Sequence, residues 1–267
     1  MDRKDDTKKI TRTILPWILP LALIVVWFFV SRTHIIPGYL LPDPIKILKT
    51  ASVYIFAEPG SSPYAGRFIH DAAASMLRVS LGFLIATLLG LPLGILSGRV
   101  AEVNSFFNTS INGLRAIPGI TWLPLAMIWF GIGVRTTVFL VAMAAFFPIY
   151  LNATAGARQI NPLLLRAGAM MGVGRVRGSY AVLLPGAMPH IMTGLRLGLG
   201  ISWAYLVLGE LTGVPDGLGA TIMDARMIGQ IDMIIVGMIL IAIVGKLSDT
   251  LLLTFLRISF KSARRMP

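Results

Sequence analysis

Residues 166–189 read RAGAMMGVGRVRGSYAVLLPGAMP, a basic and glycine-rich stretch between two long apolar runs. The stretch carries three arginines, and an arginine at the centre of a bilayer costs at least about 2.5 kcal/mol. It is therefore predicted to lie outside the lipid, as a connection between membrane-spanning helices. A basic connection of this kind is also expected to bind a partner on its side of the membrane.

The composition around this stretch is typical of a membrane protein. Of the 267 residues, 55% are hydrophobic and only 13% are charged, whereas soluble domains carry about 25% charged residues. Several apolar runs reach or approach the roughly 20 residues that a helix needs to cross a bilayer. The fold class is therefore predicted to be an all-α membrane protein. The absence of cysteine from the sequence excludes disulfides and cysteine-based metal sites.

Six transmembrane helices are predicted from the apolar runs. They cover about residues 14–31, 72–97, 106–130, 136–155, 186–210 and 231–256. The third is expected to bend or break near Pro118 and Pro124, because proline removes a helical hydrogen bond. Residues 32–70 are expected to form a segment outside the membrane, with an amphipathic helix over residues 45–56 at the interface. Residues 71–256 then contain a core of five helices.

The distribution of lysine and arginine predicts the orientation of these helices. With six spans both termini lie on one side, and that side carries fourteen basic residues against six on the other. Basic residues gather in cytoplasmic loops, so residues 1–13 and the basic tail 257–267 are predicted to be cytoplasmic and residues 32–70 periplasmic. The net charge of +12 is explained by this topology, and no nucleic acid is predicted as a partner.

Two of the predicted spans carry glycines at helical spacing. Gly90, Gly94 and Gly98 lie on one of them, and Gly194 and Gly198 on another. Small residues at this spacing let helices approach closely in lipid. Packing within the chain is favoured over a seam between two copies, because the motif is common in helical bundles.

The residues just before and within the basic stretch predict a short helix. Asn161 suits the N-cap, Pro162 the first helical position and Gly172 the C-terminal stop. About ten residues are too few to cross a bilayer, and their helical spacing places Leu164, Ala167, Gly168 and Met171 on one side. The residues alone leave two interpretations open, which are docking into a groove of another protein and lying on lipid head groups.

A resemblance favours docking. The stretch resembles the EAA loop of the membrane subunits of ABC importers, with Arg166-Ala167-Gly168 at the triplet, Gly172 at the glycine and residues 182–185, VLLP, closing the motif. It departs from that motif at residues 166, 168 and 182. The resemblance implies that residues 156–185 form a loop whose coupling helix sits in a cleft of the ATP-hydrolysing subunit. The implied coupling residues are Leu164, Arg166, Ala167, Gly168, Met171, Gly172, Arg175 and Pro185.

The resemblance extends over roughly residues 35–256. The segments YLLPDPIKI, AIPGITWLPLAMIWFGIG and LLPGAMPHIMTGLRLGLGISWAYLVLGEL resemble the nitrate, sulfonate and taurine branch of these permeases. This implies the type I ABC importer permease fold in the bacterial cytoplasmic (inner) membrane, with transport by alternating access. The implied partners are a second permease copy, two ABC ATPase subunits and an extracytoplasmic substrate-binding protein. ATP and magnesium belong to the ATPase, so no cofactor is predicted on this chain.

Two other functions are alternatives to an ABC permease, namely an enzyme in the membrane and a transporter driven by an ion gradient. An enzyme in the membrane would need catalytic or metal-binding motifs, but the three histidines are widely separated in the sequence and no HExxH spacing occurs. No P-loop is present either. A transporter driven by an ion gradient would often show internal repeats, and none is convincing. The chain is therefore predicted to be neither an enzyme nor a metal-binding protein.

Charged residues inside the spans suggest a translocation pathway. Arg115 lies beside a proline–glycine break, where freed backbone groups can line a cavity. Buried arginines on a path favour an anionic substrate, and a structural ion pair with another helix is an equally good interpretation of these charges. Lys246 and Asp249 are three residues apart and are expected to pair, and no role is predicted for Arg78. The predicted pathway residues are Arg115, Pro118, Trp122, Arg196 and Glu210.

Overall fold

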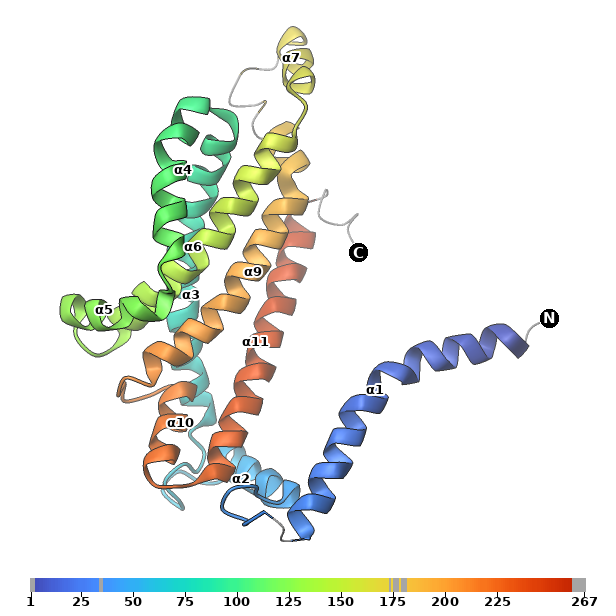
Figure 1. The fold of residues 1–267 in the computed structure, drawn as a ribbon, viewed down its shortest axis with the longest axis vertical. Coiled ribbons are helices and arrows are strands. Elements are labelled where there is room, and N and C mark those ends of the chain that lie inside the picture. The colour runs from blue at the N-terminus through green and yellow to red at the C-terminus, as the bar shows by residue number, and fades with distance from the viewer. Residues whose placement is uncertain (1–2, 34–35, 173, 175–177, 179–181, 261–267) are drawn as a thin grey trace. The chain divides into compact units, whose positions relative to one another are not determined.

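The computed structural model describes residues 3–33, 36–172, 174, 178 and 182–260, and in these ranges it contains helices and no strand (Figure 1). The chain divides into two compact units, each of which is described by itself. The first comprises residues 1–67 and 224–236, and the second comprises residues 68–223 and 237–267.

The helices follow the apolar runs of the sequence. In chain order they are α1 (Arg3–Arg32), α2 (Pro44–Phe56), α3 (Phe68–Arg99), α4 (Ala101–Ala116), the 3₁₀ helix η1 (Gly119–Trp122), α5 (Leu123–Phe130), α6 (Val134–Gln159), α7 (Pro162–Met170), α9 (Leu184–Glu210), α10 (Leu218–Met227) and α11 (Ile231–Ser259). The sequence did not predict α10. The other helices include the residues that were predicted to be helical, and most extend a few residues beyond the predicted bounds. α1 extends furthest, because it begins at Arg3, within the predicted N-terminal tail of residues 1–13.

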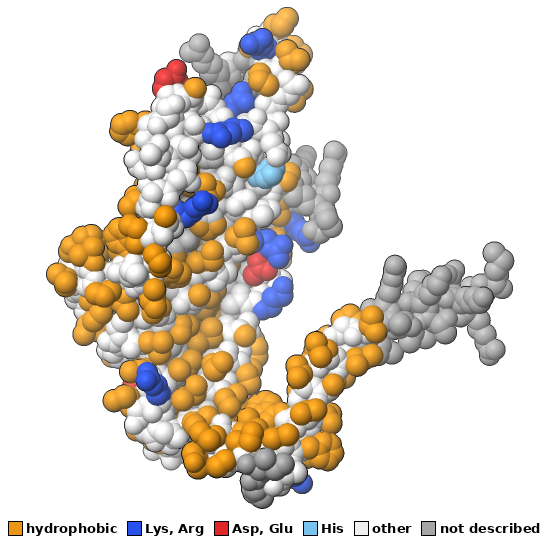
Figure 2. Space-filling model, viewed as in Figure 1, with side chains coloured by type: hydrophobic (Ala, Val, Ile, Leu, Met, Phe, Trp, Pro, Cys, Tyr) orange, Lys and Arg blue, Asp and Glu red, His pale blue; other side chains and the backbone are white. Residues whose placement is uncertain are grey.

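Five of the described helices are long and apolar enough to cross a membrane. They are the Leu15–Arg32 part of α1 together with α3, α6, α9 and α11. The bent pair formed by α4 and η1–α5 makes a sixth span if the pair is counted as one. Hydrophobic side chains cover much of the visible surface, and acidic and basic side chains occur in a few small groups (Figure 2). This pattern supports the prediction of six spans, with the third one broken.

The second unit is built around α6, which packs against α3 on one side and α9 on the other (Figure 1). Small residues permit this close packing. A Cβ atom added at Gly94 would lie 2.6 Å from the backbone oxygen of Tyr150, and one at Gly194 would lie 2.7 Å from the Cβ atom of Asn152. Both glycine stripes therefore face α6 within the same chain, which confirms the prediction of packing within the chain.

An apolar core fills the space between these three helices. Ala145 and Ile149 of α6 contact Ala86 of α3 and Met188 and Ile191 of α9, and all are at most 4% exposed. Lipid tails are as apolar as these side chains, so the helices associate here through close van der Waals packing. The core holds α3, α6 and α9 in a fixed register against one another.

The first unit is held together by polar contacts at α2 and the start of α11. Asp43 caps α2 by accepting a hydrogen bond from the backbone nitrogen of Ile45 at 3.0 Å. Asp232 accepts a hydrogen bond from Thr50 at 2.7 Å and pairs with Lys46 at 3.4 Å. In the loop after α2, burial raises the pKa of the Tyr64 phenol. The exposed apolar side chains of α2, which include Leu48 and Phe56, fit the amphipathic helix that was predicted here.

Candidate functional site

The third predicted span is broken into two helices that meet at a sharp angle. α4 ends at Ala116, and the chain then turns by 89° into η1 and α5. Pro118 lies at this break as the N-cap of η1, in agreement with the prediction. Pro124 instead lies in the first turn of α5, where its missing N–H costs no hydrogen bond. The backbone is therefore interrupted at residues 117–118, within a segment apolar enough to enter a membrane.

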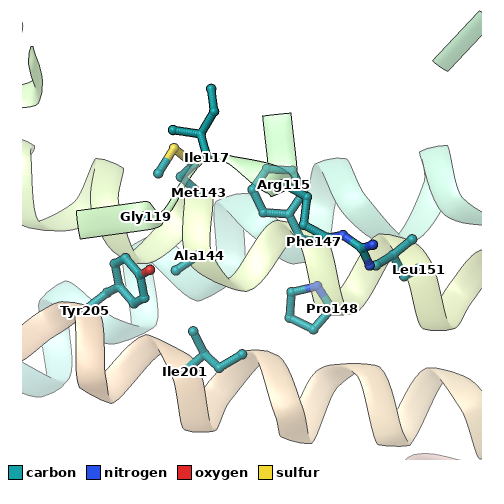
Figure 3. Close-up of a pocket in the computed structure, with 10 residues that line it drawn as sticks. All are labelled: Arg115, Ile117, Gly119, Met143, Ala144, Phe147, Pro148, Leu151, Ile201 and Tyr205. Atoms are coloured by element: carbon teal, nitrogen blue, oxygen red, sulfur yellow. The ribbon is translucent and has the colours of Figure 1, made fainter. Parts of the chain in front are cut away.

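A cavity of about 290 Å³ lies beside this break (Figure 3). We call it the Arg115 cavity. The break contributes Arg115, Ile117 and Gly119, and α9 contributes Ile201 and Tyr205. α6 lines the rest with Met143, Ala144, Phe147, Pro148 and Leu151. Since α6 rises about 1.5 Å per residue, its lining residues lie roughly 14–26 Å along a helix of about 39 Å. The cavity is thus near the middle of the span.

Arg115 is the charged residue of this lining. Its side chain is exposed, and it forms no hydrogen bond or ion pair with any residue in the described part of the chain. Its guanidinium group lies toward Leu151, while the Tyr205 ring lies toward Gly119 (Figure 3). Gly119 must be glycine for the Tyr205 hydroxyl to lie here, because a Cβ atom at residue 119 would overlap that hydroxyl. The cavity therefore combines an apolar wall with one cation and one hydroxyl group.

The structure does not bring the predicted pathway residues together in one site. Arg115 lines the cavity, Pro118 lies between two of its lining residues, and Trp122 lies in η1 outside the lining. Arg196 lines a second cavity, of about 400 Å³, between α9 and α11. Glu210 lines neither cavity.

Glu210 belongs to a buried polar network at the end of α9. Its carboxylate accepts hydrogen bonds from Arg78 at 2.6 Å, from Ser75 at 2.8 Å and from the backbone nitrogen of Gly219 at 2.8 Å. Arg78 also donates to the backbone oxygen of Asp216 at 2.8 Å and pairs with its carboxylate. Arg78 is 3% exposed and Glu210 is fully buried. The network ties the loop after α9 to α3.

The structure adds residues that the sequence did not single out. The Arg115 cavity is also lined by Met143, Phe147 and Tyr205. Hydrophobic and aromatic residues are common in apolar spans, so their presence in the sequence does not indicate a cavity. The sequence predicts no role for Arg78, although this residue is the centre of the buried network. Ser75 and Arg78, three residues apart on α3, were the available signal, since two polar residues on one side of an apolar helix indicate a polar partner.

The predicted coupling helix has the expected local geometry. Asn161 caps α7 by accepting a hydrogen bond from the backbone nitrogen of Leu163 at 2.9 Å, and Pro162 occupies the first turn. Gly172 follows the helix with φ of +82°, a left-handed conformation that glycine adopts without a side-chain clash. These three residues set the start, the length and the end of the helix as predicted.

The side chains of α7 are mostly uncovered. Leu164, Arg166, Ala167 and Met171 are exposed, whereas Gly168 is buried. Leu163, Leu164, Met170 and Met171 are each 57–86% exposed. Pro185, in the first turn of α9, is also exposed, and Arg175 lies outside the described residues. The helix thus presents apolar side chains that are not packed against the described part of this chain.

No group of three or more histidine, aspartate or glutamate side chains within the described ranges could hold a metal ion. Polar sites among the described residues of the second unit include the Arg115 cavity, the second cavity at Arg196 and the buried network. The two cavities carry cationic side chains in their linings, which suit the binding of a negatively charged group.

Comparison with known proteins agrees with a transport function. Residues 90–265 match the family described as binding-protein-dependent transport system inner membrane component. The taurine transport system permease protein of Escherichia coli is 35% identical over 228 residues, which cover 85% of this chain and 82% of that protein. The nitrate import permease protein of Synechocystis is 31% identical over 242 residues, which cover 89% of this chain and 86% of that protein.

A solved structure has the same fold. A chain from the inward-facing MetNI methionine ABC transporter superposes with a TM-score of 0.58 at 20% identity, covering 72% of this chain and 97% of that chain. Together with the family match over the helical core and the two relatives, this fold identifies the chain as a transport permease subunit and not an enzyme. The chain belongs to the family of binding-protein-dependent transport system inner membrane components, the permease subunits of ABC importers.

Proposed function

We propose that this permease subunit forms the translocation pathway for a small oxyanion, and that the anion passes through the Arg115 cavity. The observation that carries the proposal is an exposed arginine without a protein partner among the described residues, placed beside a broken helix. A charge in a membrane-spanning segment is costly and marks a substrate or ion path when it faces a cavity. Arg115 fits this description and favours a negatively charged substrate.

The relatives support the same class of substrate. The taurine and nitrate permeases are named for solutes with a sulfonate or a nitrate group. Both groups present three oxygens that a guanidinium can bind through two parallel hydrogen bonds. The hydroxyl of Tyr205 offers one further donor across the same cavity. The apolar walls formed by Met143 and Phe147 suit a small organic tail.

The second part of the proposal concerns α7, which docks in a groove of the ATPase subunit. Its exposed leucines and methionines form an apolar surface, and the flexible methionine side chains can adjust to the shape of a groove. Arg166 is exposed on the same helix and contacts acidic groups of the ATPase. ATP and magnesium bind to that subunit, and its closure moves α7.

The complete transporter contains two copies of this chain, two ATPase subunits and an extracytoplasmic binding protein that delivers the anion. Both termini and α7 lie on the cytoplasmic side, as the fourteen-to-six distribution of basic residues favours. Transport proceeds by alternating access between an inward-open and an outward-open arrangement. The ATPase biases this equilibrium because it binds the two arrangements with different affinity.

The test is ATP-driven uptake by the complete transporter in proteoliposomes, with radiolabelled taurine, methanesulfonate and nitrate as the solutes. Arg115→Gln is expected to lower uptake of the transported solute at least about tenfold, since a charged hydrogen bond contributes roughly 1.5–3 kcal/mol. Arg115→Lys should retain part of the uptake because it keeps the charge. Arg135→Gln, a change at an exposed arginine at the start of α6, is the matched control. Unchanged uptake by Arg115→Gln would refute the pathway role of Arg115.

A further inference from the structure

A second group of charges lies on α9 and α11, away from the Arg115 cavity. The guanidinium of Arg196 donates two hydrogen bonds to Asp249, Nε to Oδ1 at 3.1 Å and a terminal nitrogen to Oδ2 at 3.3 Å. Lys246 pairs with the same carboxylate at 3.6 Å, which confirms the predicted pairing of Lys246 and Asp249. We refer to Arg196, Lys246 and Asp249 as the Arg196 cluster. Two cations share one carboxylate, which leaves one excess positive charge.

The cluster lies well inside the membrane-spanning helices. Arg196 is the thirteenth residue of α9 and lies about 18 Å from the start of that helix, at 1.5 Å per residue. Asp249 is the nineteenth of the 29 residues of α11. At such a depth an exposed charge cannot face lipid without a large cost. The side chains nevertheless remain accessible, with Arg196 47% and Lys246 74% exposed.

The surface beside the cluster is hollow and lined by small or polar residues. The second cavity, of about 400 Å³, is lined by Thr193, Arg196, Gly200, Gly245 and Asp249 together with two leucines. A Cβ atom added at Gly200 would have no other atom within 4 Å, so the backbone there borders open space. Ile201 and Tyr205, which lie one and five residues after Gly200 on α9, line the Arg115 cavity. The two cavities therefore lie along adjacent faces of one helix.

From these observations we infer that the Arg196 cluster is a second anion-binding site on the translocation path, with Asp249 as a built-in competitor for the anion. The inference rests on the proposed function. Arg196 and Lys246 supply the donors, and a sulfonate or nitrate displaces the Asp249 carboxylate from one of them. The cluster lies deep in the spans, its cations are accessible, and it carries one excess positive charge. These three properties match an anion-binding site, whereas an ion pair with a purely structural role would be neutral and covered by protein.

The competitor has a consequence for transport. A site on a conduction path must attract its ion and yet release it. Asp249 lowers the affinity of both cations for the passing anion, because a carboxylate already occupies them. Removal of this carboxylate should therefore strengthen anion attraction at the cluster, and removal of Lys246 should weaken it.

The sequence contains no cysteine, so a single introduced thiol can report the local charge. Gly200→Cys places a thiol in the open space beside the cluster. Its reaction rate is measured with 2-sulfonatoethyl methanethiosulfonate, which is itself an alkanesulfonate, and with the cationic 2-trimethylammonioethyl reagent, in the purified complex with its ATPase. Nearby cations also increase the thiolate fraction, but this effect is common to both reagents and cancels in the ratio of the two rates.

The anionic reagent is expected to react faster than the cationic one. Lys246→Gln should lower the ratio about threefold to tenfold, and Asp249→Asn should raise it by a similar factor, as expected for one unit charge several ångströms away in a partly hydrated site. Excess methanesulfonate should slow labelling in the parent and more strongly in Asp249→Asn. Gly38→Cys, which also has free space around it and lies outside the helices, is the control for the intrinsic ratio of the two reagents.

Two results would overturn the inference. One is a ratio equal to that of Gly38→Cys and unchanged by both charge substitutions, which would leave the cluster as a structural ion group. The other is a thiol that reacts with neither reagent, which would show that protein covers this face. Neither result depends on uptake, so a failure here is distinguishable from a failure of the Arg115 proposal. Thermal unfolding of each variant shows that the fold is retained.

Discussion

Arg78 is a single residue on which the contact between α3 and the end of α9 depends. It reaches Glu210 and two groups of Asp216, so one side chain of α3 joins a segment that lies 132–138 residues later in the sequence. A buried ion pair adds little net stability, but removal of one partner leaves an uncompensated charge. The network thus fixes which segments come together more than it stabilises the fold.

Arg78→Met is expected to destabilise the protein by about 3–5 kcal/mol, because the Glu210 carboxylate remains buried without its cation. The double variant Arg78→Met with Glu210→Gln should recover most of this loss, since the amide is neutral and still accepts from Gly219. The measurement is unfolding of the detergent-solubilised protein. Arg135→Met, at an exposed position, should change stability by less than about 0.5 kcal/mol. A single variant as stable as the parent would show that the network is hydrated.

At the scale of the helix, α7 shows how far local sequence determines structure. Its start and end were predicted from Asn161, Pro162 and Gly172, because a cap, a first-turn proline and a left-handed glycine act over a few residues. The break at Pro118 was predicted for the same reason. The lining of the Arg115 cavity was not, because it combines side chains of α6 and α9 with those of the break. The α10 helix was missed because its residues lack a periodic apolar pattern.

Gly172 tests the role that we propose for α7. Gly172→Ala should cost roughly 1 kcal/mol through the left-handed backbone alone, since a Cβ atom there meets no atom within 4 Å. The altered exit of the chain should reduce both co-purification of the ATPase and ATP-driven uptake, and Gly172→Asn should do less harm because asparagine tolerates this conformation. Gly174→Ala is the control, because residue 174 has equal space without a left-handed φ. Equal ATPase retention in all three variants would refute the coupling role.

At the scale of the whole molecule, composition was enough to predict a helical membrane protein. The number of spans follows from the length of the apolar runs, and their direction from the basic residues. The pairing of α6 with both α3 and α9 could not be predicted, because every apolar helix offers several equivalent sides. The glycine spacing indicates which side of each helix packs closely against a neighbour, but it does not predict which helix that neighbour is.

The orientation of the chain is testable with reporter fusions. Fusions after residues 60 and 222 are expected to report the periplasm, and fusions after residues 102, 170 and 260 the cytoplasm. The physical reason is the excess of lysine and arginine on the side of the termini. Alkaline phosphatase and a fluorescent protein, which are active on opposite sides of the membrane, serve as paired reporters. A periplasmic signal at residue 170 would exclude contact between α7 and an ATPase.

The close approach of Gly94 and Gly194 to the backbone of α6 couples the movements of α3, α6 and α9. Helices that touch backbone to backbone cannot slide or rotate about their own axes without collision, so α3, α6 and α9 tilt together. α7 follows α6 at one end, and the Arg115 cavity lies near the middle of α6. A tilt of about 10° about the centre of a helix roughly 39 Å long moves each end by about 3 Å. A small movement of α7 is thereby accompanied by displacement at the opposite end of the bundle, while the Arg115 cavity near the middle of α6 moves little.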